Sequence, residues 1–159
     1  MRLALALARE NVIREGGGPF GAAVFEIGTG RLVAAGVNSV VRLGNFALHA
    51  EMMALMTAQQ VRGTFTLRGA RLPAHELVSS CEPCAMCLGG ILWSGVRRVV
   101  YGARGDDARR LDFDEGPVFA DTYRYLEDRG IEFVRDVLLE EGRAVLELYR
   151  EHGGPIYNG

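Results

Sequence analysis

All three cysteines of the chain, Cys81, Cys84 and Cys87, lie in one short stretch, SSCEPCAMCLGG, at residues 79–90. Three is an odd number, and cysteines this close together do not form a disulfide framework. Such a cluster is typical of metal binding or of thiol chemistry in a reducing compartment. We therefore expect a metal site in a cytoplasmic protein.

Cys84 and Cys87 are spaced to bind one ion together. They stand three positions apart, just after Pro83, which suits the first turn of a helix and places both thiols on one face. The free N–H groups of a first turn favour thiolates. With His49 as an imidazole ligand, zinc would have three protein ligands and an open fourth position for water, as in catalytic sites. We predict one Zn²⁺ per subunit, bound by His49, Cys84 and Cys87.

Glu51 follows His49 by two positions, which separates the two side chains by about 200° around an ideal helix. Both can address one ion only if His49 lies at the irregular start of the helix. Glu51 would then lie beside the zinc without binding it. A carboxylate in that place can carry a proton from an activated water to a substrate, which is general acid and base catalysis.

Cys81 is a possible further ligand. It precedes Cys84 by three positions, so a third thiolate that fills the open position is conceivable. Because Pro83 begins the helix, Cys81 should remain on the strand side and point elsewhere. A free cysteine commonly packs as a small apolar side chain, and we expect a buried thiol here.

Alternating helices and strands must position these residues. Apolar periodicity and stop signals predict helices at 2–15, 49–61, 84–93, 119–129 and 138–151. Short apolar runs predict strands at 20–27, 31–37, 77–78, 96–101 and 131–137, the first two joined as a hairpin. The helix between the last two strands makes them parallel, because a tight turn joins only antiparallel strands. The predicted fold class is α/β, with a five-stranded mixed sheet and helices on both faces.

The composition indicates one domain and excludes two classes of partner. The chain has 159 residues, 48% of them hydrophobic, which suffices for a core without disulfides. No repeat or linker divides it, so we assign residues 1–159 to a single domain. The net charge of −2 offers no basic surface for a nucleic acid. No run approaches the roughly 20 apolar residues that cross a bilayer, and we interpret the opening MRLALALARE as an amphipathic helix and not as a secretory leader.

Several segments together resemble one superfamily. They are GGPFGAAVFE at 17–26, HAEMMAL at 49–55, SCEPCAMCLGGILWSG at 80–95 and FDEGP at 113–117, with Asn38 after the second strand. The pairing of H-x-E with P-C-x-x-C is the signature of zinc nucleobase deaminases. From about residue 16 to residue 121 or further, the chain resembles the cytidine-deaminase-like superfamily, and within it most resembles the small bacterial guanine deaminases. The resemblance implies a three-layer αβα sandwich with zinc between the starts of two helices.

The resemblance also implies a reaction, the hydrolysis of guanine to xanthine and ammonia by attack of water on C2. Glu51 would protonate the ring nitrogen beside C2 and then the departing amine. Glu115 matches the family position of a second acid, which would accept hydrogen bonds from N1–H and the 2-amino group. Asp114 is the fallback for that role, and a solvated acidic loop is the plain alternative.

Four further residues are candidates for contact with the base. Asn38 would bind the base edge, with a turn cap after the strand as the alternative. Ala50, between His49 and Glu51, should contact the substrate as well. Trp93 and Phe20 would form walls of the pocket, and a role in the core is equally open for both.

The tail at 153–159, GGPIYNG, combines a flexible glycine pair with Ile156 and Tyr157. In the guanine deaminases that the chain resembles, the C-terminal segment is exchanged between two subunits, and an aromatic residue closes the neighbour's site. We therefore expect a homodimer with Tyr157 in that role. A frayed terminus is the alternative.

Other functions stay open at this point. Cytosine, triazines such as ammeline, and pterins would undergo the same chemistry. A tRNA adenosine deaminase is disfavoured by the acidic pI of about 5.9. A non-catalytic zinc module is a different class, and Glu51 argues against it because a structural site has no use for an uncoordinated acid beside an open ligand position.

Overall fold

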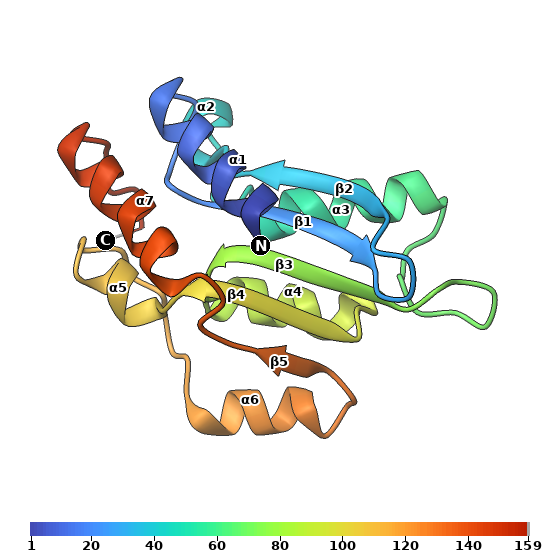
Figure 1. The fold of residues 1–159 in the computed structure, drawn as a ribbon. Helices are drawn as coiled ribbons and strands as arrows, with labels where there is room; N and C mark the ends of the chain where they lie inside the picture. The colour runs from blue at the N-terminus through green and yellow to red at the C-terminus, as the bar shows by residue number, and fades with distance from the viewer. Residues whose placement is uncertain (159) are drawn as a thin grey trace.

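A mixed sheet of five strands lies between two layers of helices in the computed structural model, which describes residues 1–158 (Figure 1). The strands run in the order β2-β1-β3-β4-β5 across the sheet. Their bounds are β1 Gly21–Glu26, β2 Leu32–Val37, β3 His75–Cys81, β4 Arg98–Ala103 and β5 Glu132–Val134. The predicted fold class is confirmed.

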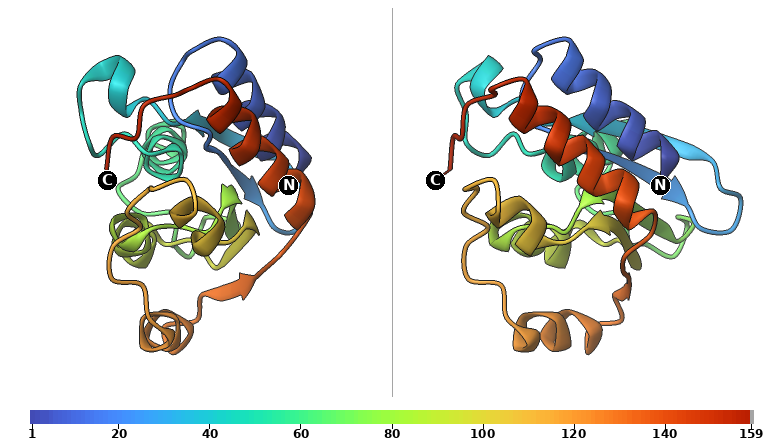
Figure 2. Two further views of the ribbon diagram at one scale, coloured as in Figure 1. Left: turned by 90° about the vertical axis from the view of Figure 1, so that its left-hand side faces the viewer. Right: turned by 60° about the vertical axis from the view of Figure 1, so that its left-hand side comes forward.

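The helices divide between the two faces of the sheet. They are α1 Arg2–Ile13, α2 Val40–Leu43, α3 Ala50–Arg62, α4 Ala85–Ser94, α5 Gly105–Arg109, α6 Ala120–Glu127 and α7 Leu139–Glu151. Helices α1 and α7 pack together on one face, whereas α3, α4 and α6 cover the other (Figure 2). This is the three-layer αβα sandwich that the resemblance implied.

Strand direction places two loops at one edge of the sheet. β1 pairs antiparallel with β2 and β3, whereas β3, β4 and β5 run parallel to one another, as predicted for the last two strands. The carboxyl ends of parallel strands meet at the same edge. The segment that follows Cys81 therefore lies beside the segment that follows Ala103, with which Cys81 is in register.

The start of α3 packs directly on β2 at Gly36. A Cβ at this position would lie 2.5 Å from both the carbonyl oxygen of Ala50 and the amide nitrogen of Ala54. Only glycine permits such a close approach of helix backbone to strand. The first turn of α3, which begins after His49, is thereby fixed against the sheet.

Some boundaries differ from the prediction. β3 is longer than 77–78 because the buried Ser79 and Ser80 continue it, with Ser80 Oγ accepting a hydrogen bond of 3.1 Å from Gly21 N. β5 is shorter than 131–137, and positive φ angles of 61° at Asp136 and 56° at Leu138 interrupt the extended backbone that follows it. Helices α2 and α5 were not predicted, because elements of four and five residues carry no readable period. Across residues 1–158, no helix has the length and apolar character that would span a bilayer.

Candidate metal and catalytic site

His49 occupies the position that its spacing to Glu51 requires. It is the N-cap of α3, with φ −64° and ψ 156°, so its backbone is extended and not helical. The side chains of a cap residue and of a residue in the first turn are therefore not set 200° apart. The prediction that His49 lies at the irregular start of the helix is confirmed.

Cys84 occupies the same position on α4. The expectation that Pro83 opens this helix is wrong, because Cys84 is the N-cap with extended backbone, φ −67° and ψ 173°, and Ala85 is the first helical residue. Cys87 is then the third residue of the helix. The side chain of an N-cap residue points toward the third helical position, so the two thiols still face one ion.

The three predicted ligands come together. Their ligand atoms all lie within 4.8 Å of one another, and Cys84 Sγ is 3.5 Å from His49 Nδ1. A tetrahedral zinc with bonds of about 2.3 Å to sulfur and about 2.0 Å to nitrogen holds such atoms roughly 3.5–3.8 Å apart. Two sulfur donors and one imidazole also suit zinc chemically. The residues present therefore fit a zinc ion.

The surroundings favour a thiolate at Cys84. A hydrogen bond from the Cys87 thiol, together with the neighbouring His49 ring, lowers the pKa of Cys84 to about 4. A ligand that is already deprotonated binds a metal without first releasing a proton. The site is electrostatically prepared for a cation.

Cys81 lies apart from this set. Its side chain is buried among Val12, Ala103 and Phe113, which belong to the core between the sheet and α7. Its sulfur is 3.6 Å from the carbonyl oxygen of Arg104, and burial raises its pKa well above the usual range. Cys81 is a buried neutral thiol, as expected.

Two buried carboxyl groups share the site. Glu51, in the first turn of α3, is 5% exposed, and Glu115, in the loop between α5 and α6, is 6% exposed. Burial, and after it the charge of Cys84, raises the pKa of both groups, that of Glu115 to about 8. A carboxyl group with a raised pKa can exchange a proton near neutral pH. The alternative of a solvated loop is wrong for Glu115.

Asn38 is fully buried and presents one free donor. Its Oδ1 lies 3.4 Å from Gly18 N and 3.3 Å from Val40 N, both of which donate to it. This fixes the orientation of the amide. Its Nδ2 is buried without a hydrogen-bond partner among residues 1–158. A buried N–H group without a partner is costly, and it suggests a carbonyl oxygen supplied by a ligand.

A pocket of about 320 Å³ opens over the metal ligands, a volume at the lower end for small-molecule sites. It is lined by Phe46, His49, Cys84, Ala85, Met86, Asp114, Glu115, Gly116 and Asn158. Asp114 is exposed, and its Oδ1 accepts a hydrogen bond of 2.8 Å from Gly116 N. It thus shapes the loop that holds Glu115.

Six of the predicted catalytic and substrate-binding residues lie outside this lining: Phe20, Asn38, Ala50, Glu51, Trp93 and Tyr157. Phe20 is partly buried and packs against the hydrophobic clusters on both faces of the sheet. Its ring meets that of Phe113 edge to face, with centroids 5.2 Å apart. The indole of Trp93 is 77% exposed on α4, so a role in the core of this chain is wrong. Neither side chain forms a wall of the pocket in the isolated chain.

The tail covers the site of its own chain. The ring of Tyr157 lies 5.2 Å from that of Phe113 and 6.4 Å from that of His49. Its hydroxyl is buried without a partner among the residues that the structure describes. Asn158 accepts a hydrogen bond from Asp114 N at 3.1 Å and donates one to Asp114 O at 2.8 Å. The alternative of a frayed terminus is wrong for residues 153–158.

Comparison with known proteins decides the family. Over residues 1–103 the chain matches the model of the cytidine and deoxycytidylate deaminase zinc-binding region. This match includes His49, Cys84 and Cys87 and covers more than half of the chain. The chain belongs to this deaminase family.

Individual members of the deaminase family match over most of the chain. The guanine deaminase of Bacillus subtilis is 35% identical over 140 residues, which are 88% of this chain and 85% of the relative. The structure of NE0047 in complex with 2,6-diaminopurine superposes with a TM-score of 0.92 at 46% identity, covering 98% of this chain and 82% of that chain. The guanine deaminase from Nitrosomonas europaea gives a TM-score of 0.90 at 45% identity over 94% and 81% of the two chains. A probable cytosine deaminase of Schizosaccharomyces pombe is 33% identical over 102 residues, 64% of this chain and 57% of the relative.

Sequence reasoning missed part of the pocket of this deaminase. Phe46, Ala85, Met86 and Asn158 line it, yet none carries a chemical group that marks it as functional. Ala85 and Met86 lie between the two cysteines, and Asn158 follows Tyr157. Position between two predicted ligands was a signal for Ala85 and Met86, whereas Phe46 and Asn158 reach the pocket only through the fold of the chain.

Proposed function

We propose that this protein is a zinc-dependent guanine deaminase that converts guanine and water to xanthine and ammonia. One observation carries the proposal. Glu115 is a buried carboxyl group that lines the pocket together with His49 and Cys84, and Asn38 has a buried amide nitrogen without a hydrogen-bond partner among residues 1–158. Guanine has the matching groups, the O6 acceptor and the N1–H and 2-amino donors. The similarity to two guanine deaminases supports the same substrate.

The residues of the chain divide the work of this reaction. Glu115 would accept hydrogen bonds from N1–H and the 2-amino group, while Asn38 donates to O6. Zinc bound by His49, Cys84 and Cys87 would acidify a water molecule and so supply the nucleophile. Glu51 would take the proton of that water, deliver it to the ring nitrogen beside C2 and then help to protonate the departing amine.

Ala50 and Tyr157 would orient the ring. Ala50 is the first residue of α3 and stands in the sequence between His49 and Glu51. Tyr157 would cover the base from the tail, and burial keeps its hydroxyl protonated by raising its pKa. Holding the base between these groups places C2 where water attacks.

The assembly and cellular setting complete the proposal. We propose a homodimer in which the tail is exchanged and Tyr157 covers the neighbouring site, a cytoplasmic location and a role in purine catabolism. Gly153, with φ 65°, lies where the tail leaves α7, and a hinge there would send the tail to either subunit. Sedimentation of the purified protein tests the dimer.

An ammonia-release screen tests the function. The zinc-loaded protein is incubated separately with guanine, cytosine, adenine, ammeline and a 2-aminopterin, and ammonia is measured. We expect guanine to give the highest kcat/KM. A protein that releases ammonia from cytosine and not from guanine would contradict the proposal.

Cytosine is the second candidate, because the chain is also similar to a probable cytosine deaminase. Glu115→Gln separates the two. A glutamine replaces one acceptor oxygen by a donor, which meets the donor edge of guanine, so we expect kcat/KM on guanine to fall by about 10²-fold or more. A cytosine deaminase that does not use Glu115 would lose far less.

A further inference from the structure

Glu82 lies between the buried Cys81 and the metal ligand Cys84, and no step of the proposed reaction uses it. We propose that Glu82 is a positioning residue, whose carboxylate fixes Cys84 and the loop that carries Glu115 relative to each other. The inference rests on the proposed function, in which Glu115 reads the base.

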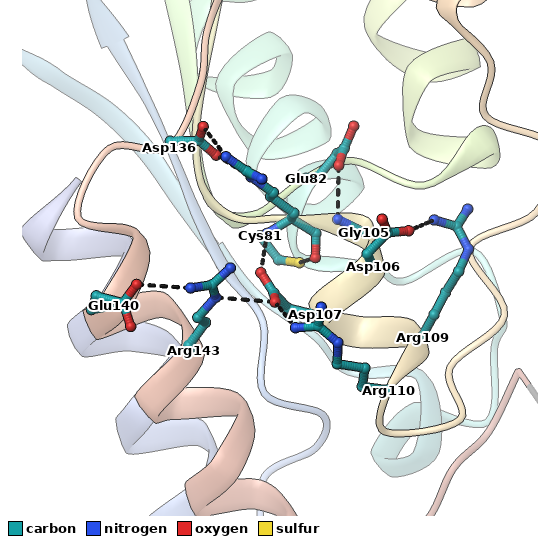
Figure 3. Close-up of polar contacts among 11 residues, drawn as sticks. Cys81, Glu82, Gly105, Asp106, Asp107, Arg109, Arg110, Asp136, Glu140 and Arg143 are labelled. Carbon is teal, nitrogen blue, oxygen red and sulfur yellow. Dashed lines mark hydrogen bonds and ion pairs between the residues drawn. The ribbon is translucent and has the colours of Figure 1, made fainter.

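Three donors from three elements converge on this carboxylate. Its Oε2 accepts a hydrogen bond of 2.7 Å from Gly105 N at the start of α5, as Figure 3 shows. Its Oε1 accepts a hydrogen bond from the hydroxyl of Tyr123 on α6, and the hydroxyl of Tyr101 on β4 lies 3.5 Å from the same oxygen. Burial first and the charge of Glu82 second raise the pKa of Tyr101 to about 12, and burial followed by the hydrogen bond to Glu82 raises the pKa of Tyr123. Both hydroxyls therefore keep their protons and donate.

The loop that carries Glu115 connects two helices, α5 and α6, that each donate a hydrogen bond to this carboxylate. It leaves α5 after Arg109 and enters α6 at Ala120, so the donors on Gly105 and Tyr123 stand at its two sides. Glu115 itself is bonded to the start of α4, next to the metal ligand Cys84, because its carbonyl oxygen accepts a hydrogen bond of 2.9 Å from Ala85 N. Glu82, the loop and the start of α4 thus form a closed ring of contacts.

The start of α5, where Gly105 donates to Glu82, is fixed by further hydrogen bonds. Asp107 Oδ2 accepts a hydrogen bond of 3.0 Å from Arg104 N, and Asp107 Oδ1 accepts another of 3.0 Å from Arg143 Nε on α7. The carbonyl oxygen of Arg104 lies 3.6 Å from Cys81 Sγ. The start of α5 is thus bonded to α7 through Arg143 and contacts β3 through Cys81. The hydrogen bond from Gly105 N to Glu82 therefore connects the loop of Glu115 and the start of α4 to a well-packed part of the fold.

Glu82→Ala tests the inference, with Glu76→Ala as the matched control. Glu76 lies at the other end of β3 and bonds Arg98 at 2.7 Å. Groups that orient metal ligands commonly change metal affinity or activity by about 10–100-fold. We expect Glu82→Ala to lower kcat/KM on guanine by about tenfold or more and to release zinc to a chromogenic chelator about tenfold faster. Glu82→Gln should recover most of both losses, because an amide oxygen can still accept from Gly105 N.

A double-mutant cycle with Glu115→Gln shows whether Glu82 acts through Glu115. If it does, Glu82→Ala costs much less activity once Glu115 has been changed, because coupled residues are not additive. Full additivity, or a Glu82→Ala protein that matches Glu76→Ala in kinetics and in zinc release, would overturn the inference. Should Glu82→Ala not fold, Tyr123→Phe removes one donor and keeps the ring that packs on Phe133, and the same cycle is run with it.

Zinc release separates this inference from the proposed function. It is measured without substrate, so it reports on Cys84 even if guanine is not turned over. A wild-type protein inactive on guanine would contradict the proposed function, and the cycle would then use the base that the screen identifies. Normal turnover by the wild type with unchanged zinc release in Glu82→Ala would contradict only the role of Glu82.

Discussion

At the scale of single residues, the site depends on two helix starts that each present a ligand from an extended cap. His49 and Cys84 are the N-caps of α3 and α4, and Glu51 and Cys87 follow within the first turn of each helix. A cap residue can turn toward the same point as the residues that follow it, which residues inside a helix at the same spacing cannot do. This geometry brings Glu51, the proposed proton carrier, beside the predicted metal ligand His49 over a span of three residues.

Glu51→Gln removes the proposed proton carrier and keeps the size of the side chain. General acid and base catalysis typically contributes about 10²–10⁴-fold, so we expect kcat to fall by that factor while the zinc content stays at one ion per chain. Steady-state kinetics and metal analysis of the same sample measure both quantities. Retention of wild-type kcat would remove Glu51 from the mechanism.

The sequence predicted the metal-binding and acidic residues of the site better than the residues that line its pocket. His49, Glu51, Cys84 and Cys87 could be found because their spacing has a chemical meaning that does not depend on distant parts of the chain. Asn158 could not, because it reaches the pocket through a fold of the tail that brings it beside Asp114. Contacts between residues far apart in sequence leave no local pattern.

At the scale of elements, the position of α3 depends on Gly36. A Cβ added at Gly36 would collide with the backbone at the start of α3. Gly36→Ala must therefore displace the turn that carries His49 and Glu51. Overpacking of this kind typically costs about 1–3 kcal/mol. We expect lower stability in urea and a kcat reduced by more than the loss of folded protein explains. Gly28→Ala, where an added Cβ meets nothing within 4 Å, is the control and should leave both unchanged.

The edge of the sheet away from the site contains a charge cluster that makes stability depend on pH. Glu26 is 5% exposed and accepts hydrogen bonds from Arg31, Thr29 and Arg62, which lower its pKa from 4.5 to about 2. Because the folded pKa is depressed, this carboxylate stabilises the fold fully above pH 4.5, and the contribution is lost as the pH falls toward 2.

Glu26→Gln should therefore be less stable than the wild type at pH 6, and the difference should shrink between pH 4.5 and 2. Urea unfolding of both proteins at pH 6, 4 and 3 measures the difference directly. Loss of zinc in acid affects both proteins alike, so it cancels in the comparison. A difference that stays constant over this range would show that the charge of Glu26 does not stabilise the fold.

The helix predictions were right where the apolar period and the stop signals agree, as in α1, α3 and α7. They were wrong where the backbone departs from regular helix or strand geometry. Pro83 suggested a helix start one residue before the cap, because a proline is acceptable both just before a helix and in its first turn. The short α5 was missed although it matters for the site. Its start is held locally by Asp107, which bonds Arg104 N, and from a distant part of the sequence by Glu82, which bonds Gly105 N.

At the scale of the whole molecule, the tail lies over the site, on its own chain in the structure and on the partner in the proposed dimer. Removal of residues 153–159 takes away Tyr157 and Asn158, and we expect KM for guanine to rise by about tenfold or more because the ring is no longer covered. Gly18→Ala gives an independent test. A Cβ there would lie 2.3 Å from the hydroxyl of Tyr157, so the tail must move aside while the core stays intact. Unchanged KM in both variants would show that the tail has no part in binding.

The way in which Asn158 is held has a kinetic consequence. Two hydrogen bonds join it to Asp114, and each contributes only about 0.5–1.5 kcal/mol in water. A closure this weak breaks and re-forms many times while the sheet beneath it stays folded. Amide protons of residues 156–158 should therefore exchange with solvent long before those of β3, and in the proposed reaction the same fluctuation would let xanthine leave.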